Sequence, residues 1–222
     1  MIVLALDTST LLAGAAIWQS GRVLAERQRI VTTHSDALMV MVDEAFAEAR
    51  IAPADVDVVV CGAGPGSFTG LRIGLATAKG LAFALARPLV MVSSLAGLAA
   101  RAPSGRVCAM VDALKGEVYA GIYTIVDGTP RPDGEERVLP PAALLARLVA
   151  APVDHVVGSG VAKYPELAVA PILDAAPGPW AADLARLGAA RAELRDFDDL
   201  ATATPKYIRA SEAELVKKKP QQ

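Results

Sequence analysis

The sequence predicts an α/β protein built from two related lobes. The first half alternates strand-like and helical patterns in the order βββαβαβα, and a looser version of this order restarts near residue 106. A chain of 222 residues is also long enough to bury a core without disulfides or a metal. The segment 102–105, Ala-Pro-Ser-Gly, places the boundary between a lobe of residues 1–102 and a lobe of residues 103–222. Packing of the C-terminal tail against the first lobe is left open.

The first lobe is expected to open with strands at residues 2–7, 14–18 and 22–30, the last two joined by a tight turn at 19–21. An amphipathic helix then begins near His34, with Thr33 or Ser35 as its cap. Met39 and Val40 fall outside its apolar face, which makes this helix a candidate for contact with a second chain. The apolar face itself consists of Ala37, Leu38, Met41, Val42, Ala45, Phe46 and Ala49.

The remaining elements follow in the same manner. A buried strand at 56–61 leads into a glycine-rich segment at 62–74, and a helix runs from there to about residue 86, before Pro88. A strand at 89–92 and a short helix at 94–101 complete the first lobe. The second lobe is expected to contain strands at 106–111 and 117–126, a turn at 127–134, a helix at 142–150 and a strand at 155–158.

The amino-acid composition argues against a membrane or secreted protein. Apolar residues make up 53% of the chain, yet no apolar run approaches the roughly 20 residues that cross a bilayer. Asp7 interrupts the first apolar run, and no basic stretch precedes it, so we expect neither secretion nor membrane insertion but a cytoplasmic protein. Apolar surface in excess of the core is expected to face another protein.

Charge and cysteine content narrow the classes further. A net charge of -2 argues against a protein that binds nucleic acid unaided, so RNA contact is expected only through partners. The basic run 217–219 is expected to be a solvated tail. Cys61 and Cys108 form no C-x-x-C pair and are expected to be buried, as in a reducing compartment.

The glycine-rich segment does not fit either phosphate-binding template. The dinucleotide fingerprint needs glycine where Ser67 and Thr69 stand, and the P-loop pattern is absent. Anion binding by the amides of residues 64–67 at a helix N-terminus remains an unspecific alternative. The segment instead begins a row of small residues spaced four apart: Gly66, Gly70, Gly74, Ala78, Ala82 and Ala86.

Such a row lets another helix approach closely. Part of it is expected to pack inside its own lobe. Because spacing of four drifts around a helix, a single intramolecular neighbour is not expected to use every position, and a second partner is predicted. The predicted partner surface comprises Met39, Val40, Gly66, Gly70, Gly74 and Ala78.

Two places could hold a phosphate weakly. Asp7, Thr8, Ser9 and Thr10 follow the first strand, where their oxygens could hold a metal-bound phosphate or close a turn with local hydrogen bonds; the turn is favoured slightly. Asp112 occupies a similar position at the end of the first strand of the second half. Lys115-Gly-Glu117 nearby adds little weight.

The sequence gives little support for a metal site or a catalytic nucleophile. His34 and His155 are far apart, and Leu38 stands four residues after His34, where an H-x-x-x-H pair would need its second histidine. No G-x-S-x-G elbow occurs, and neither serines nor cysteines come with an evident base. We therefore expect no metal site and no catalytic residue in this chain.

Several motifs together resemble the YeaZ/TsaB family. They are Asp7-Thr-Ser-Thr10, His34-Ser35, Gly64-Pro-Gly-Ser-Phe-Thr-Gly-Leu-Arg-Ile-Gly74, Val111-Asp-Ala113, Gly116-Glu-Val-Tyr119 and Pro205-Lys-Tyr-Ile-Arg209. The resemblance covers nearly the whole chain and is loose between about residues 127 and 201. It implies an actin-like, sugar-kinase and Hsp70 type of fold, with two duplicated lobes that each carry a mixed sheet flanked by helices.

The resemblance also implies a role. Family members pair with a related catalytic subunit, TsaD, and work with an ATPase, TsaE, in placing threonylcarbamoyl on the adenosine next to the anticodon of tRNA. The partner carries the metal-binding H-x-x-x-H, which Leu38 prevents here, so ATP and metal are expected to enter through partners and this chain to require no cofactor of its own. Weak ATP or ADP binding stays open. Family pairing uses the first two helices, and members alone can form homodimers through the same surface.

One departure and one rival interpretation remain. Leu114-Lys115 replaces a pair that is often more basic in the family, which weakens a phosphate role for Asp112. The rival to a non-catalytic partner subunit is a stand-alone enzyme, either a nucleotide-dependent phosphotransferase or the peptidase that an older glycoprotease label suggests. A phosphotransferase needs paired carboxylates and an adenosine pocket, and a peptidase needs a nucleophile or a metal.

Overall fold

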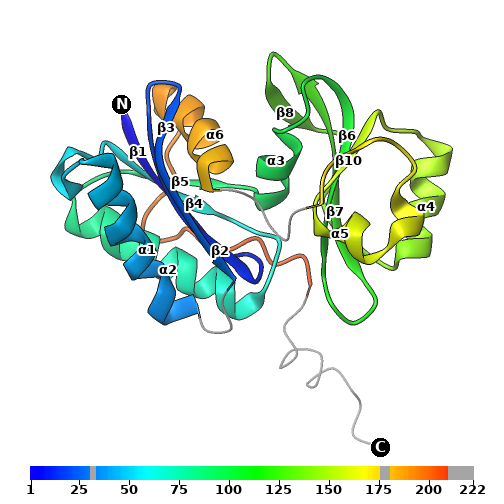
Figure 1. Cartoon of the computed structure of the whole chain (residues 1–222), viewed down its shortest axis with the longest axis horizontal. Coiled ribbons are helices and arrows are strands. Elements are labelled where there is room, and N and C mark those ends of the chain that lie inside the picture. The colour runs from blue at the N-terminus through cyan, green and yellow to red at the C-terminus, as the bar shows by residue number, and fades with distance from the viewer. Residues whose placement is uncertain (31–33, 176–180, 210–222) are drawn as a thin grey trace, which may run out of the picture.

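Two mixed β-sheets, one in each lobe, organise the chain (Figure 1). The computed structural model describes residues 1–30, 34–175 and 181–209. The elements of the first half are β1 (Ile2–Asp7), β2 (Leu12–Gln19), β3 (Arg22–Ile30), α1 (His34–Ala49), η1 (Pro53–Asp55), β4 (Val58–Gly62), α2 (Phe68–Ala84), β5 (Leu89–Val92) and α3 (Ser94–Ala99). The second half contains β6 (Gly105–Asp112), β7 (Val118–Val126), β8 (Thr129–Pro132), β9 (Arg137–Leu139), α4 (Pro141–Ala150), β10 (His155–Val157), α5 (Ser159–Lys163), η2 (Pro165–Leu167), β11 (Ile172–Asp174) and α6 (Ala181–Glu193).

The first sheet has the order β3-β2-β1-β4-β5. β1 runs antiparallel to β2 and parallel to β4, which places it at the centre of the sheet. Its side chains alternate between two hydrophobic clusters: Leu4 and Leu6 face α1 and α2, whereas Val3 and Ala5 face α6. The continuous apolar sequence of β1 therefore reflects burial on both faces.

The second sheet has the order β11-β10-β6-β7-β8, with β9 also paired to β7. Cys108 and Met110 of β6 face α4 and α5, whereas Val107 and Ala109 face α3. Each sheet is thus mixed and covered by helices, which confirms the predicted α/β class and two-lobed architecture. No helix in the described ranges is long and apolar enough to cross a membrane.

The helices do not divide at residue 102 as the two sheets do. α3 comes before the predicted boundary but packs on β6 and β7 of the second sheet. α6 comes after it but covers the first sheet, across β1, β2, β4 and β5. The chain after α6 also returns along the first lobe, where the amide of Asp198 donates to the carbonyl of Leu89.

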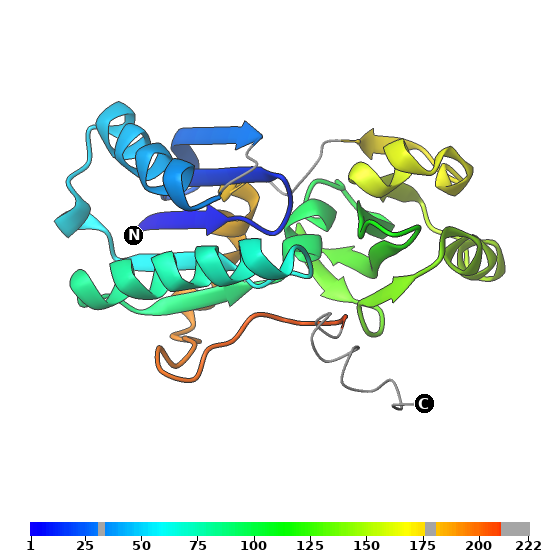
Figure 2. The ribbon, with the colours of Figure 1, turned by 90° about the horizontal axis from the view of Figure 1, so that it is seen from below.

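Residues 196–209 form a segment that we call the strap. Figure 2 shows it in orange to red, passing below α2 toward the second lobe. The Asp198 carboxylate accepts a 2.7 Å hydrogen bond from the amide of Met91, and Lys206 donates its amide to the carbonyl of Ala63. Through these hydrogen bonds the strap packs on the first lobe, which is the alternative that the sequence left open for the C-terminal residues. The basic run 217–219 lies outside the described residues.

The turn predicted at 127–134 was wrong in part, because Thr129–Pro132 forms β8. Pro130 and Pro132 suggested a turn, yet both are tolerated because β8 is an edge strand. The sequence pattern also provided no expectation for β9, α5, β11 and α6, most of which are short.

Both cysteines are buried in central strands, Cys61 on β4 and Cys108 on β6. Burial raises the pKa of the Cys61 thiol, and it raises the pKa of Cys108 from its ordinary value of 9.0 to about 12. The Cys108 thiol therefore ionises more readily in the unfolded chain than in the folded protein. Its stabilising contribution to the free energy of unfolding is present below a pH of about 9 and is lost as the pH rises above that value.

The folded protein is accordingly expected to react negligibly with Ellman's reagent at pH 8, since the thiolate is the reactive form. The same protein in denaturant should release the signal of both of its cysteines. Rapid reaction of the folded protein would show that the two strands are open to solvent.

Candidate functional site

The residues that follow β1 form a closed, buried turn. The Oδ1 atom of Asp7 accepts hydrogen bonds from the Ser9 amide at 2.8 Å and the Ser9 hydroxyl at 2.6 Å, and its Oδ2 accepts from the Ser94 hydroxyl at 2.7 Å. Thr8 donates its hydroxyl to the Gly70 carbonyl, and Thr10 hydrogen-bonds with Leu12. Asp7, Thr8 and Ser9 are buried, and the hydrogen bonds of Asp7 and Ser9 close the turn, as the favoured interpretation expects; a phosphate role for these residues stays a prediction.

The glycine-rich segment packs directly on this turn. A Cβ atom added to Gly66 would lie 2.0 Å from the Ser9 carbonyl oxygen, and one added to Gly74 would lie 2.2 Å from the Thr8 hydroxyl oxygen. Gly62 is equally constrained, since its Cβ would lie 1.8 Å from Asp7 Oδ2. These glycines let α2 and the loop before it approach the turn after β1.

The small-residue row therefore requires a correction. Gly70, Gly74 and Ala78 are buried against the first lobe, whereas Gly66 lies close to Ser9 and is partly exposed. The sequence predicts an intramolecular neighbour for part of this row and a partner for the rest. The helix turns Gly70, Gly74 and Ala78 inward, because only small residues fit between α2 and the β1 turn. The intramolecular interpretation holds for Gly70, Gly74 and Ala78, and a partner contact of Gly66 stays a prediction.

The side of α2 opposite the buried row is exposed. Helix α1 lies beside α2 on the same face of the first sheet (Figures 1 and 2). On α1, Met39 is 42% and Val40 46% exposed, as helical periodicity predicts. On α2, Phe83 is 79% exposed. We call this surface the α1/α2 face, and it comprises Met39, Val40, Asp43, Phe68, Arg72, Ala76, Gly80 and Phe83.

The sequence pattern did not predict the α2 residues of this face. Phe68, Arg72, Ala76 and Gly80 recur every four residues, just as the buried row does. Gly80 has no atom within 4 Å of a would-be Cβ, unlike Gly74. Phe83, three residues after Gly80, was the available signal in the sequence, because a large apolar residue off the buried row marks a contact surface.

The strap adds an aromatic side chain to one end of this face. The Tyr207 ring lies 5.0 Å from that of Phe68, and its hydroxyl accepts a 3.1 Å hydrogen bond from Arg72 Nε. Arg72 Cζ lies 4.0 Å from the centre of the Phe68 ring, a cation–π contact. The Pro205–Arg209 motif thus contacts α2, although it is 135 residues away in sequence.

Asp112, the last residue of β6, takes part in a turn of the second lobe. Its Oδ1 accepts a 2.9 Å hydrogen bond from the Leu114 amide, which closes the turn between β6 and β7. Arg209 secures the same turn by donating to the Ala113 carbonyl at 2.7 Å and pairing with Glu117. The turn therefore has a structural explanation, and a phosphate role for Asp112 stays a prediction.

A buried polar cluster joins the lobes beside the strap. Ser93 and Tyr123 both donate to Glu136 Oε1, and Lys206 Nζ lies 3.1 Å from Glu136 Oε2. Burial, followed by the neighbouring Glu136 carboxylate, raises the pKa of the Tyr123 hydroxyl, which keeps it protonated as a donor. The Glu136 side chain is only 5% exposed, so these partners compensate for the loss of its contact with water.

Lys206→Met is expected to reduce the free energy of unfolding by about 1–2 kcal/mol, because it leaves the buried Glu136 carboxylate without its cation. The matched control is Lys163→Met, since Lys163 is exposed and has no ion pair with any described residue. Urea unfolding curves measure both. Equal stability of the two variants would show that the ion pair contributes nothing.

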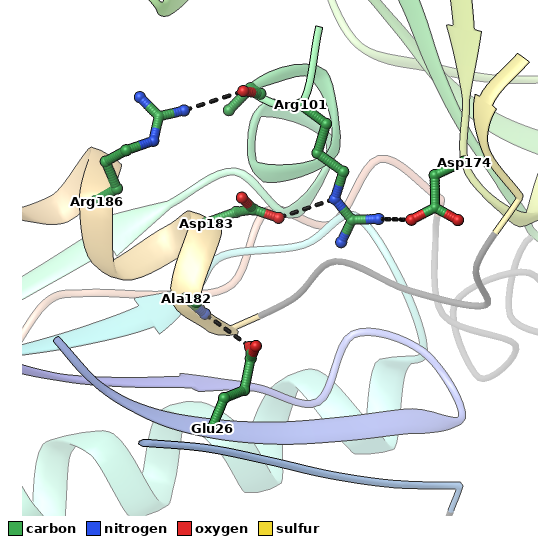
Figure 3. Close-up of polar contacts among 7 residues, drawn as sticks. Glu26, Arg101, Asp174, Ala182, Asp183 and Arg186 are labelled. Carbon is green, nitrogen blue, oxygen red and sulfur yellow. Dashed lines mark hydrogen bonds and ion pairs between the residues drawn. The ribbon is translucent and has the colours of Figure 1, made fainter. Parts of the chain in front are cut away.

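A second polar network joins residues of the two lobes, as Figure 3 shows. Arg101, after α3, donates to Asp183 of α6 at 2.8 Å and pairs with Asp174 of β11. Glu26 of β3 accepts from the Ala182 amide at the start of α6. Burial raises the pKa of Glu26, and the Ala182 hydrogen bond opposes that shift. Together with the Glu136 cluster, the Arg101 contacts connect the two lobes at more than one place.

Metal-ligating groups do not gather among the described residues, where no cluster of three or more His, Cys, Asp or Glu side chains occurs. His155 lies on β10, in the second sheet. The side chains of His34, Ser35 and Asp36 and the cap at Thr33 lie outside the described residues. Leu38, which has no metal-binding atom in its side chain, is fully buried in the first-lobe core.

Comparisons with known proteins agree on one family. The family model described as TsaD, tRNA N6-adenosine threonylcarbamoyltransferase, matches residues 28–221. The tRNA threonylcarbamoyladenosine biosynthesis protein TsaB of Escherichia coli is 34% identical over 173 residues, which is 75% of each chain. TsaB of Bacillus subtilis is 39% identical over 131 residues, 58% of this chain and 57% of the relative. The solved structure of YeaZ from Pseudomonas aeruginosa has a TM-score of 0.80 at 37% identity and covers 93% of this chain and 99% of that one.

Proposed function

This chain belongs to the TsaD family and, within it, to the TsaB (YeaZ) proteins, and on that premise we propose that it is a partner subunit in tRNA threonylcarbamoyladenosine biosynthesis. In this role it pairs with a TsaD-type catalytic subunit and activates it. The threonylcarbamoyl transfer itself takes place on the partner, and tRNA is bound only through the assembly, together with a TsaE-type ATPase.

The observation that carries the proposal is the α1/α2 face. It presents Met39, Val40 and Phe83 to solvent on two adjacent helices, with Ala76 and Gly80 providing a flat strip between the larger groups. A soluble monomer gains nothing by exposing these residues together, whereas a helix of a partner could pack closely over the small ones.

A related subunit is the natural occupant of such a face. The family model that matches this chain is named for TsaD, so a TsaD-type subunit shares its ancestry and is expected to share its first two helices. Related subunits commonly pair through equivalent surfaces about a two-fold or approximate two-fold axis. Helices α1 and α2 would then pack against their counterparts.

A supporting role without catalysis follows from how the Asp7 turn is used. In a phosphotransferase of this fold, a carboxylate after the first strand must reach a metal-bound nucleotide. Here both Asp7 oxygens accept hydrogen bonds from Ser9 and Ser94, and the side chain is fully buried. We therefore propose that ATP and metal enter the assembly through its other subunits, and that this chain requires no cofactor.

Pairing is tested by mixing the chain with the TsaD-type subunit from the same organism and measuring mass by size-exclusion chromatography with light scattering. A stable complex that contains both chains supports the proposal. Two separate peaks at every mixing ratio contradict it, and a nucleotide-binding screen with Asp7→Ala as the comparison then tests the stand-alone phosphotransferase.

A further inference from the structure

In the described part of the chain, the polypeptide passes between the two lobes three times. It leaves the first sheet after β5 to enter α3, returns from β11 to α6, and crosses again along the strap. Arg101 holds the second crossing, because it contacts Asp174 before the crossing and Asp183 after it (Figure 3). Two crossings leave a pair of lobes free to rotate about the line that joins them, whereas a third connection limits that rotation.

The strap makes this third connection within a few consecutive residues. The Lys206 amide donates to the Ala63 carbonyl of the first lobe at 2.8 Å, whereas its Nζ lies 3.1 Å from Glu136 Oε2 of the second. Tyr207 contacts the first lobe again, with its ring centre 5.0 Å from that of Phe68 on α2. Neighbouring residues of the strap thus hold different lobes.

The next two residues contact the second lobe. Ile208 packs against the hydrophobic cluster that β6, β7 and α3 form. Arg209 donates to the Ala113 carbonyl at 2.7 Å and pairs with Glu117, both at the turn between β6 and β7. We call residues 206–209 the latch.

The latch is too short to stretch. Tyr207 and Arg209 are two residues apart, so the chain between their Cα atoms spans at most about 7 Å. If the second lobe moves away from α2, either Arg209 loses its contacts with the β6–β7 turn or Tyr207 is drawn off Phe68. A change in the angle between the lobes is therefore transmitted to Tyr207.

Tyr207 also lies at one end of the α1/α2 face. Its side chain is 42% exposed and that of Phe68 is 37% exposed, so a subunit packed on this face would cover both rings. Removal of water strengthens the hydrogen bond that Arg72 donates to the Tyr207 hydroxyl. Coverage of the face and closure of the latch would then favour each other, since coupling between two sites is reciprocal.

From these observations we propose that residues 206–209 are a latch that fixes the angle between the lobes, and that Tyr207 couples its closure to occupancy of the α1/α2 face. The inference rests on the proposed function for the occupant of that face, and adds its regulation. Pairing tightens the latch, and a closed latch supports pairing.

The latch is tested on the isolated full-length chain by double electron–electron resonance between spin labels at Arg22→Cys of the first lobe and Ala146→Cys of the second. Both positions are exposed, whereas Cys61 and Cys108 are buried and are not expected to be labelled. The distance distribution is expected to be narrow, and to become about twofold broader when Arg209→Met removes the contacts of the latch with the β6–β7 turn.

The matched control is Arg106→Met. Arg106 makes similar contacts entirely within the second lobe, with Asp133 at 2.8 Å and with the carbonyls of Ala151 and Pro152. Its loss is expected to leave the distance distribution narrow. Thermal melts check that both variants are folded.

The coupling is tested by calorimetric titration with the TsaD-type subunit. Arg209 contacts the second lobe, so any effect of Arg209→Met on pairing must travel through the strap. We expect this variant to raise the dissociation constant about fivefold, and Arg106→Met to pair like the wild type. Pairing of the wild type is expected to slow hydrogen exchange of residues 196–209 by a similar factor.

Each outcome decides a stated part of the inference. An unchanged distance distribution in Arg209→Met would overturn the latch. A broader distribution with unchanged pairing and unchanged exchange of the strap would overturn the coupling, as would equal weakening by Arg209→Met and Arg106→Met. Failure of the wild-type chain to pair contradicts the proposed function instead, and the spin-label distances of the isolated chain still decide the latch.

Discussion

Ala76→Arg is expected to abolish pairing with the TsaD-type subunit, raising the dissociation constant at least about 100-fold. Ala76 lies in the middle of the exposed row of α2, between Arg72 and Gly80. A long charged side chain there prevents close helix approach and would bury a cation without a partner. Isothermal titration calorimetry measures the loss.

The matched control is Ala146→Arg. Ala146 is an exposed residue of α4 in the second lobe, so the substitution has the same helix propensity and the same charge at a position far from the α1/α2 face. It is expected to pair like the wild type. Normal pairing of the Ala76→Arg chain would remove the α1/α2 face as the site of contact, and loss of pairing by both variants would point to a general charge effect.

Gly74→Ala is expected to lower the free energy of unfolding by about 2–4 kcal/mol. The new Cβ would lie 2.2 Å from the Thr8 hydroxyl oxygen, which is itself committed to the Gly70 carbonyl at 2.7 Å. Thr8 is buried and cannot rotate away without giving up that hydrogen bond. The cost is therefore both steric and polar.

Gly80→Ala on the same helix provides the comparison. No atom lies within 4 Å of a Cβ at Gly80, so the substitution should add about 0.5–1 kcal/mol of stability through helix propensity alone. Urea midpoints at equal slopes measure the difference between the two variants. If both glycines tolerate alanine equally, α2 does not contact the β1 turn as closely as described.

Local patterns predicted the fold well where the elements depend on neighbours in sequence. Alternation and chain breakers located β1, β3 and β5 at the residues where the structure has them, and the 3.6-residue period located α1. The assignment of α3 and α6 to opposite sheets was out of reach. It depends on contacts between segments far apart in the chain, such as Arg101 with Asp183, which periodicity does not encode.

The candidate site shows the same limit. Two rows with the same spacing of four run along α2, one through Gly74 and one through Gly80, and only the β1 turn beneath decides which is buried. Met39 and Val40 could be predicted as exposed because α1 has a single clear apolar face. The contact of Tyr207 with Phe68 and Arg72 could not, since it depends on the path of the strap.

The most direct test of the proposed role is a threonylcarbamoyl-transfer assay on tRNA with the TsaD-type and TsaE-type subunits. It compares reactions without this chain, with the wild type, with Ala76→Arg and with Ala146→Arg. We expect transfer to require the wild-type or Ala146→Arg chain and to be lost with Ala76→Arg. Full transfer in the absence of the chain, or with the Ala76→Arg chain at its normal rate, would contradict a partner subunit that acts through the α1/α2 face.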